Sequence, residues 1–282
     1  MAFRHRLRAG KRLNRLLENS KQPGQNRETN ELVNEDALTK PWLAGKRVLI
    51  TSGPTFAPLD AVRSITNRST GRLGCAIARS IRKHGAEVVF LAGETSQVPK
   101  AAGSAGGGRP LLLVERFVTV PDLKRLLMNH LTGRPFDAVV MAAAVLDYYP
   151  VESVAGKKRS DEDEWIVRLK RGEKIIEQIK SWAPDVFLVG FKLEARVSQE
   201  ELAARAGDLI KRSRADLVVA NRLEDIGAGR HEACLVEADP AEGDYRISGS
   251  LHTREAIAEH LAARLAERLS SKTKQAAGEA GK

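Results

Sequence analysis

The sequence predicts an α/β protein with a Rossmann-like, doubly wound and mainly parallel sheet, helices on both faces of the sheet, and a small antiparallel extension. Two observations support this prediction. Short apolar runs of strand length recur along the chain, and amphipathic segments of helix length separate most of them. Strands that alternate with helices form parallel sheets, because each crossover helix returns the chain to the same end of the sheet.

The expected elements follow one another from Lys46 onward. The expected strands are 47–50, 87–91, 111–114, 137–142, 187–190 and 216–220, followed by an antiparallel pair at 234–237 and 245–247. The expected helices are 71–84, which Gly85 ends, 120–131 and 254–269. In such sheets ligands bind outside the carboxyl ends of the strands, so functional residues are sought there.

Composition is typical of a globular protein. Hydrophobic residues make up 42% and charged residues 29% of the 282 residues, enough for a sizeable core. No apolar run approaches the roughly 20 residues of a membrane-spanning helix. The start of the chain has no apolar signal-peptide core either, so we expect a cytoplasmic protein without membrane contact. The two cysteines, Cys75 and Cys234, form neither a disulfide framework nor a zinc site and are expected to be buried.

The net charge of +10 is concentrated in part near the N-terminus, at Arg4, Arg6, Arg8, Lys11, Arg12 and Arg15. Residues 1–42 are predicted to be a basic, mostly disordered extension, residues 43–270 the folded domain, and residues 271–282 a disordered tail. A basic arm can bind nucleic acid, and a solvated tail without a partner is the alternative. We do not expect nucleic acid as a partner, because the folded part has its own small-ligand crevice.

The approach to the first helix has the composition of a phosphate-binding connection. Residues 51–55 are small or turn-forming, and Ser69, Thr70 and Gly71 precede the helix. Ser69 or Thr70 is predicted to be its N-cap. Free amides at a helix N-terminus suit a phosphate when small neighbouring residues leave the approach open.

Two alternatives stay open for this stretch. It can be a tight strand-to-helix connection that binds nothing, or part of a dinucleotide-binding fold. For the second alternative the glycine fingerprint is displaced, since Gly71 and Gly74 come about twenty residues after the strand.

Mostly small or polar residues follow four of the expected strands at their carboxyl ends. In chain order these residues are Gly53, Thr55, Arg63 and Asn67; Ala143, Ala144, Asp147 and Tyr148; Phe191, Lys192 and Glu194; and Asn221. They are expected to surround one crevice. No histidine, serine elbow or nucleophilic cysteine lies among them, which favours chemistry by positioning and charge neutralisation.

The segment between the fourth and fifth expected strands is basic. Its cations are Lys157, Lys158, Arg159, Lys170, Arg171 and Lys174. This segment is predicted to close over a triphosphate as a flap, and a solvated charged hairpin is the alternative.

Six motifs follow one another in an order and spacing that make them far more specific than any one of them. They lie at 51–55 (TSGPT), 58–63 (PLDAVR), 67–74 (NRSTGRLG), 142–150 (AAAVLDYYP), 190–194 (GFKLE) and 215–221 (ADLVVAN). Over about residues 46–266 the chain resembles the phosphopantothenoylcysteine synthetase family of coenzyme A biosynthesis. The GFKLE motif and the short stretch before the first strand are more similar to free-standing members than to bacterial forms fused to a flavin decarboxylase, so we expect a free-standing form.

The resemblance implies a two-step ligation. The carboxylate of 4′-phosphopantothenate attacks the α-phosphate of a nucleoside triphosphate, and the amino group of L-cysteine then attacks the resulting acyl nucleotide. The implied nucleotide is CTP, as in bacterial members, or ATP, as in some eukaryotic ones, with Mg²⁺ on the phosphates and no metal ligands assigned to the protein. The resemblance also implies a homodimer and a separate phosphopantothenoylcysteine decarboxylase in the same pathway.

Residue roles follow from the resemblance by position. Lys157 matches a lysine of the first step, where a cation beside the α-phosphate offsets growing charge. Asn67 and Arg63 match residues of the second step, and Ala144 a small position whose backbone approaches the acyl phosphate. The residues implied to contact the nucleotide or phosphates are Gly53, Thr55, Ser69, Thr70, Gly71, Ala143, Asp147, Lys158 and Phe191.

The sequence also departs from the family pattern. Leu146 replaces a small residue, Arg159 stands where lysine is common, and residues 172–176 replace a proline-containing loop. An inactive relative or a changed substrate is therefore an alternative. A short-chain NAD(P)-dependent reductase is another, but neither Tyr148 nor Tyr149 has the required lysine four residues on.

Overall fold

Eight strands form the central sheet of the described chain, in the order β14-β13-β10-β9-β6-β1-β4-β5. The computed structural model describes residues 41–100, 112–227, 229–239 and 244–279, apart from the side chains of 244 and 271–279. Most of the predicted basic extension lies outside these residues. The strands are β1 (Arg47–Pro54), β4 (Glu87–Gly93), β5 (Leu112–Phe117), β6 (Ala138–Ala144), β9 (Phe187–Glu194), β10 (Leu217–Arg222), β13 (Cys234–Asp239) and β14 (Asp244–Ile247).

The pairing of these strands confirms the predicted Rossmann-like sheet. Neighbouring strands from β5 to β10 run parallel, whereas β13 and β14 add an antiparallel edge beside β10. The strand order reverses at β1, which lies between β4 and β6. Open α/β sheets bind ligands at such a switch point, so the carboxyl end of β1 is where a site is expected.

Several strands continue past their predicted ends. β1 pairs with β6 as far as Gly53↔Ala143 and Pro54↔Ala144, and β9 continues to Glu194. An apolar run marks only the buried middle of a strand, whereas backbone pairing extends into the small and polar residues beyond it. Gly53 and Ala143, which were expected to follow the strands, are therefore among the last paired residues of β1 and β6.

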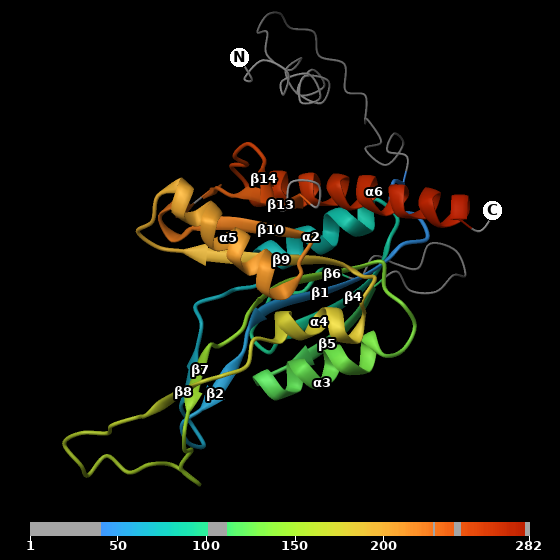
Figure 1. Cartoon of the computed structure of the whole chain (residues 1–282). Helices are drawn as coiled ribbons and strands as arrows, with labels where there is room; N and C mark the ends of the chain where they lie inside the picture. Colours follow the sequence, from blue (N-terminus) through green and yellow to red (C-terminus); the bar gives the residue numbers. More distant parts are fainter. Residues whose placement is uncertain (1–40, 101–111, 228, 240–243, 280–282) are drawn as a thin grey trace, which may run out of the picture. The chain divides into compact units, whose positions relative to one another are not determined.

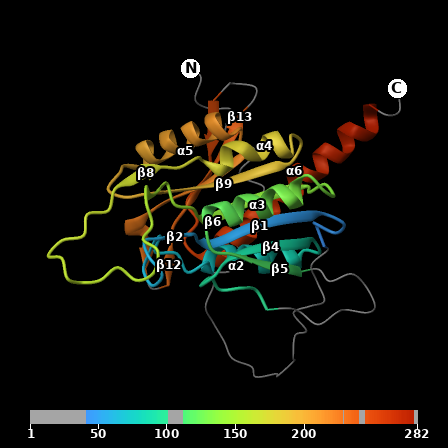
Figure 2. The same cartoon turned by 90° about the horizontal axis from the view of Figure 1, so that it is seen from below.

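Helices cover both faces of the sheet (Figures 1 and 2). The helices are α2 (Arg72–Lys83), α3 (Val120–Leu131), α4 (Ile179–Trp182), α5 (Gln199–Ser213) and α6 (Arg254–Glu279). α2 and α6 share one core cluster, to which Ile77 and Leu261 belong, and α3, α4 and α5 share the cluster on the other face. α6 continues past Leu269 into the segment for which the sequence predicts a disordered tail.

The starts of two helices show how the local sequence sets them. α3 begins with a capping box, in which Thr119 and Asp122 each bond to the backbone of the other. The N-cap of α2 is Gly71, which has a φ of 72° and no side-chain cap. The prediction that Ser69 or Thr70 caps this helix is therefore wrong, because the chain reaches α2 through a left-handed turn that favours glycine.

Short antiparallel hairpins lie beyond the carboxyl ends of the strands, where the sequence predicts only connections. β2 (Phe56–Pro58) pairs with β3 (Ser64–Thr66), and β7 (Tyr148–Pro150) pairs with β8 (Leu169–Arg171). A further pair, β11 (Ile226–Gly227) and β12 (Arg230–His231), follows β10. In Figure 1 the labels of β2, β7 and β8 lie together at the end where β1 leads into β2. Strands of two or three residues are too short to show an alternating apolar pattern.

His84, directly after α2, joins three segments. Its Nε2 lies 2.6 Å from Oε1 of Glu259 on α6, and Oε2 of Glu259 accepts a hydrogen bond of 2.8 Å from Ser80. Trp42 stacks on the His84 ring with the two centroids 4.0 Å apart. α2, α6 and the segment that leads into β1 are thus fastened together at the C-terminal end of α2.

Two expectations from composition can be compared with the structure. Cys75 and Cys234 are both buried and unbridged, as expected. Within the described ranges, no helix has both the length and the apolar composition that crossing a membrane requires.

A buried carboxylate fastens α6 to the antiparallel edge. Glu237 on β13 accepts hydrogen bonds from Arg264 at 2.6 and 2.5 Å and from Arg268 at 2.7 Å. Burial alone would raise the pKa of Glu237, but the hydrogen bonds from the two guanidinium groups outweigh burial and lower that pKa.

We expect Glu237→Gln to lower the free energy of unfolding by about 2–3 kcal/mol at pH 7, because it removes the buried negative charge to which Arg264 and Arg268 both donate. Urea unfolding measures this difference. Since the pKa of Glu237 is lower in the folded chain, its stabilisation is present above the ordinary glutamate pKa and is lost as the pH falls through the lowered value. The gap between wild type and variant should therefore narrow below about pH 4.

Glu255→Gln is the matched control on the same helix. It removes an exposed carboxylate 3.9 Å from Arg79, so we expect a change of less than about 0.5 kcal/mol. Equal losses in the two variants would mean that Glu237 contributes no more than a surface charge.

Candidate active site

Two glycines bring three backbone segments close together at the end of β1. Gly53 and Gly71 have positive φ values of 83° and 72°. A Cβ atom at Gly71 would lie 1.9 Å from Oγ of Ser96, and one at Gly53 would lie 2.4 Å from Cβ of Ser96. Because Ser96 follows β4, the end of β1, the start of α2 and the loop after β4 meet where only glycine fits.

The start of α2 has neither a capping side chain nor a negative charge of its own. No side chain caps Gly71, and the first turn contains no acidic residue. Oγ of Ser52 donates a hydrogen bond of 3.1 Å to the carbonyl of Gly71 and so holds this turn against β1. Ser69 is half-buried and Thr70 is exposed beside it. Free amides and the helix dipole favour an anion at this position.

Asn67 fastens the connection before α2 to the end of β6. Its Nδ2 donates a hydrogen bond of 3.0 Å to the carbonyl of Ala144, which also accepts one of 3.3 Å from the amide of Thr55. Oγ1 of Thr55 in turn accepts an amide N–H from the turn after β6, at 3.0 Å. Ala143 lies beside Gly53 in the strand register. The structure thus brings these five predicted site residues together around one turn.

The guanidinium group of Arg63 is held by a neighbouring carboxylate. Its Nε and Nη2 donate to Oδ2 of Asp60 at 2.9 and 2.6 Å, and its carbon lies 4.6 Å from the centroid of the Trp165 ring. The Asp60 side chain is fully buried. Burial alone would raise the pKa of Asp60, but hydrogen bonds from Arg63 and from backbone amides outweigh it and hold that pKa well below its ordinary range.

Lys157 lies in the segment between β7 and β8, which extends away from the sheet in both views (Figures 1 and 2). Its side chain is exposed and has no hydrogen bond or ion pair within the described ranges. The next two cations are paired, Lys158 with Glu162 at 2.6 Å and Arg159 with Asp161 at 3.2 Å. The basic segment is therefore a hairpin loop, whose closure over a triphosphate stays a prediction.

Asp147 and Phe191, the predicted nucleotide contacts, lie on different segments: Asp147 precedes β7, and Phe191 lies within β9. Asp147 is exposed and forms an ion pair with Lys174. Phe191 is half-buried on β9. Among the described residues, no hydrogen bond or ion pair joins the side chain of either residue to Asn67 or Lys157.

Glu194 is the last residue of β9 and forms ion pairs with one cation on β9 and one on α5. It lies 2.9 Å from Nζ of Lys192 and 2.5 Å from Nη1 of Arg205 on α5. Burial alone would raise the pKa of Glu194, but these two cations lower it. Arg205 therefore reaches the carboxyl edge of the sheet, whereas Arg212 on the same helix pairs with Glu177 at 3.5 Å.

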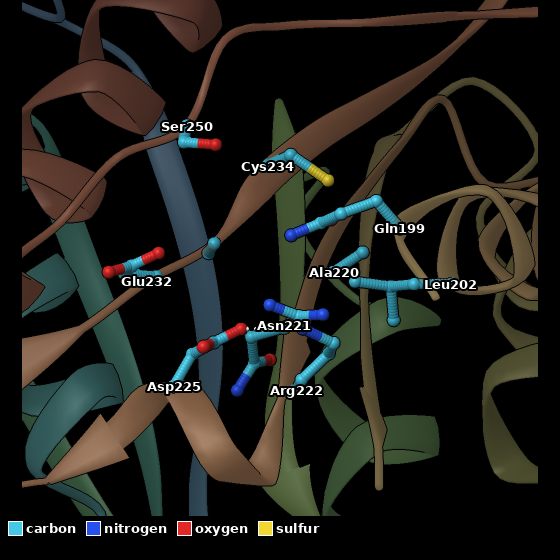
Figure 3. A pocket seen from close by; sticks show the side chains of 10 residues that line it. Gln199, Leu202, Ala220, Asn221, Arg222, Asp225, Glu232, Cys234 and Ser250 are labelled. Atoms are coloured by element: carbon cyan, nitrogen blue, oxygen red, sulfur yellow. Dashed lines mark hydrogen bonds and ion pairs between the residues drawn. The ribbon is translucent and has the colours of Figure 1, made fainter. Parts of the chain in front are cut away.

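A small pocket lies beside the end of β10 (Figure 3). Asn221 lines it, and Nε of Arg222 donates a hydrogen bond of 2.6 Å to Asp225 within it. β9 separates β10 from β6 in the sheet, so the two strand ends lie two strand spacings, roughly 10 Å, apart. The pocket thus shares the edge of the sheet with the Asn67–Ala144 contact but is separate from it.

Sequence reasoning did not select Asp60, Ser96 or Trp165 as site residues. For Asp60 a signal was present, because a carboxylate three residues before Arg63 can bond to its guanidinium. Ser96 and Trp165 reach the site from distant segments, and a single sequence holds no signal for such contacts.

Residues 43–269 match the family model described as the DNA/pantothenate metabolism flavoprotein C-terminal domain. The coenzyme A biosynthesis bifunctional protein CoaBC of Thermococcus kodakarensis is 38% identical over 219 residues, which cover 78% of this chain and 50% of that protein. A cysteine/cysteine sulfinic acid decarboxylase of an unknown prokaryotic organism is 30% identical over 204 residues, 72% of this chain and 53% of that protein. The chain thus spans about half the length of these relatives.

A solved structure agrees with the fold. The DNA/pantothenate metabolism flavoprotein from Streptococcus pneumoniae aligns with a TM-score of 0.68 and 28% identity, covering 78% of this chain and 98% of that chain. The matched family region contains the β1 end, the Asn67–Ala144 contact and the basic hairpin loop. The resemblance drawn from the six motifs is confirmed: the chain belongs to the DNA/pantothenate metabolism flavoprotein C-terminal domain family.

Proposed function

We propose that the protein is a phosphopantothenate–cysteine ligase, which joins 4′-phosphopantothenate to L-cysteine through an acyl-nucleotide intermediate. The Asn67–Ala144 contact carries the proposal, because it holds the end of β6 to the connection that leads into the uncapped N-terminus of α2. Two anionic reactants must meet in this ligation, and a helix N-terminus offsets part of their charge. The likeness to proteins named for coenzyme A biosynthesis supports this substrate class.

In the proposed first step, a carboxylate oxygen of 4′-phosphopantothenate attacks the α-phosphorus of the nucleotide, and pyrophosphate leaves. Lys157 offsets the charge that grows on the α-phosphate in this transition state. In the second step the amine of cysteine attacks the acyl carbon and gives up a proton, and nucleoside monophosphate leaves. The amide nitrogen of Asn67 is used by Ala144, so its amide oxygen is the atom proposed to orient the amine.

CTP is the proposed nucleotide, with ATP as the alternative, and Mg²⁺ would neutralise charge on its phosphates. The described residues hold no group of three or more histidine, cysteine or carboxylate side chains arranged for a metal ion. Mg²⁺ commonly binds through substrate phosphates and water, and that mode fits this set of residues. The homodimer and the separate phosphopantothenoylcysteine decarboxylase implied by the resemblance belong to the same proposal.

Lys157→Gln is expected to slow pyrophosphate release about 100-fold or more, because it removes a cation from the transition state of the first step. The measurement is pyrophosphate release by purified protein with 4′-phosphopantothenate, Mg²⁺, and CTP or ATP in parallel, without cysteine. Arg159→Gln is the matched control, since it changes the neighbouring exposed cation that already pairs with Asp161. Release with neither nucleotide, from folded wild-type protein, would reject the ligase.

Asn67→Asp is expected to retain pyrophosphate release but to accumulate acyl nucleotide when cysteine is present, because a carboxylate cannot donate the hydrogen bond to the carbonyl of Ala144 that fixes the side-chain oxygen in place. Quenched mixtures analysed by chromatography and mass spectrometry measure this intermediate. Asn129→Asp, at an exposed position on α3, is the control for the added charge and should behave as wild type. Equal slowing of both steps in Asn67→Asp would contradict a role confined to the second step.

A further inference from the structure

The carboxylate of Asp60 joins two segments that are far apart in the sequence. Its Oδ1 accepts hydrogen bonds from the amides of Val62 and Arg63, at 2.9 and 2.7 Å, and so shapes the turn between β2 and β3. Its Oδ2 accepts from the Arg63 side chain and also from the amide of Lys158, at 3.1 Å. One oxygen therefore holds the turn, and the other holds the segment that carries Lys157.

The backbone on both sides of Lys157 is fixed to this turn. On one side, the carbonyl of Gly156 accepts a hydrogen bond of 3.0 Å from the amide of Ala61. On the other side, the amide of Lys158 donates to Asp60, and its carbonyl accepts a bond of 2.7 Å from Nη2 of Arg63. The position of the Lys157 backbone thus follows from the turn, whereas its side chain is exposed.

Arg63 completes the arrangement. Its guanidinium group donates hydrogen bonds to the carboxylate of Asp60 and to the carbonyl of Lys158. The central carbon of the same group lies over the ring of Trp165. Trp165 belongs to the same hairpin loop as Lys157, so Arg63 contacts this loop at two places. A planar guanidinium suits these contacts, because it presents several N–H groups and also stacks on aromatic rings.

We propose that Asp60, Arg63 and Trp165 form a clamp that positions Lys157 for the first step of the reaction. Asp60 is then a positioning residue, which acts on the α-phosphate only through the lysine. This inference rests on the proposed function, and it assigns Arg63 to the first step, whereas the resemblance implies a role in the second.

The chemistry of the clamp requires an ionised carboxylate. Every group that bonds to the carboxylate of Asp60 is an N–H donor, so an asparagine at this position would face these donors with N–H groups of its own. The lowered pKa of Asp60 keeps the carboxylate ionised at a pH below that at which an ordinary aspartate is protonated. The side chain is fully buried, so water does not replace a lost bond easily.

Asp60→Asn and Arg63→Gln are expected to slow pyrophosphate release roughly 100-fold, because a displaced catalytic group loses its alignment. A role of Arg63 in the second step alone would instead leave release unchanged and accumulate acyl nucleotide. Asp161→Asn is the matched control, since it neutralises an exposed aspartate of the same loop that pairs with Arg159.

A second measurement reports on the clamp without the reaction. Trypsin cleaves after lysine and arginine, and residues 157–159 offer three such sites next to the clamp. Cleavage there should be about tenfold faster in Asp60→Asn than in wild type or Asp161→Asn, since a released segment is open to the protease more often. Lys157→Gln should leave cleavage after Lys158 unchanged. Far-UV circular dichroism and thermal unfolding establish that each variant is folded.

A double-mutant cycle decides whether Asp60 acts through Lys157. If it does, Asp60→Asn combined with Lys157→Gln releases pyrophosphate no more slowly than Lys157→Gln alone. Additive losses would overturn the positioning role. If Asp60→Asn does not fold, Trp165→Leu is the second variant, with smaller changes expected in the same direction.

The two proposals fail in different ways. Wild-type protein that releases no pyrophosphate rejects the ligase, and faster trypsin cleavage in Asp60→Asn would still show the clamp. Cleavage and release that are both unchanged in folded Asp60→Asn would reject the clamp and leave the ligase standing.

Discussion

The close approach of three backbone segments at Gly53 and Gly71 is the constraint on which the site depends. A side chain at either position would collide with Ser96, so glycine alone lets the end of β1, the start of α2 and the loop after β4 meet. No side chain caps the first amides of α2 at this meeting point. Asn67 then needs only one hydrogen bond to fix the turn that contains Ala144.

Much of the fold could be predicted from the sequence. The bounds of α3, Val120–Leu131, agree with the prediction, because apolar periodicity and a capping residue mark the same ends. The buried middles of the strands were predicted for a similar reason, since a parallel strand buried on both faces is a continuous apolar run. The same rule that places ligands at strand ends also led to Asn67, Thr55 and Ala144, which the structure brings together.

What the sequence did not reveal depends on contacts between distant segments. The N-cap of α2 was assigned to a hydroxyl residue by local preference, but crowding by Ser96 selects a left-handed glycine there. The β7–β8 pairing and the contact of Arg63 with Trp165 join segments with no shared periodicity. Asp60 was visible as a polar residue, yet only the folded chain shows that one of its oxygens serves the loop of Lys157.

α2 also determines where the rest of a polypeptide can be attached. Its N-terminus begins after Gly71, beside the end of β1, and Trp42 and Glu259 fasten its other end through His84. At 1.5 Å per residue, the 12 residues of α2 separate these two ends by about 18 Å. Trp42 therefore lies near the end of α2 that is remote from Gly71. A domain fused before Trp42 would be tethered at that end of α2, away from the contacts that Gly53, Gly71 and Ser96 make at the other end.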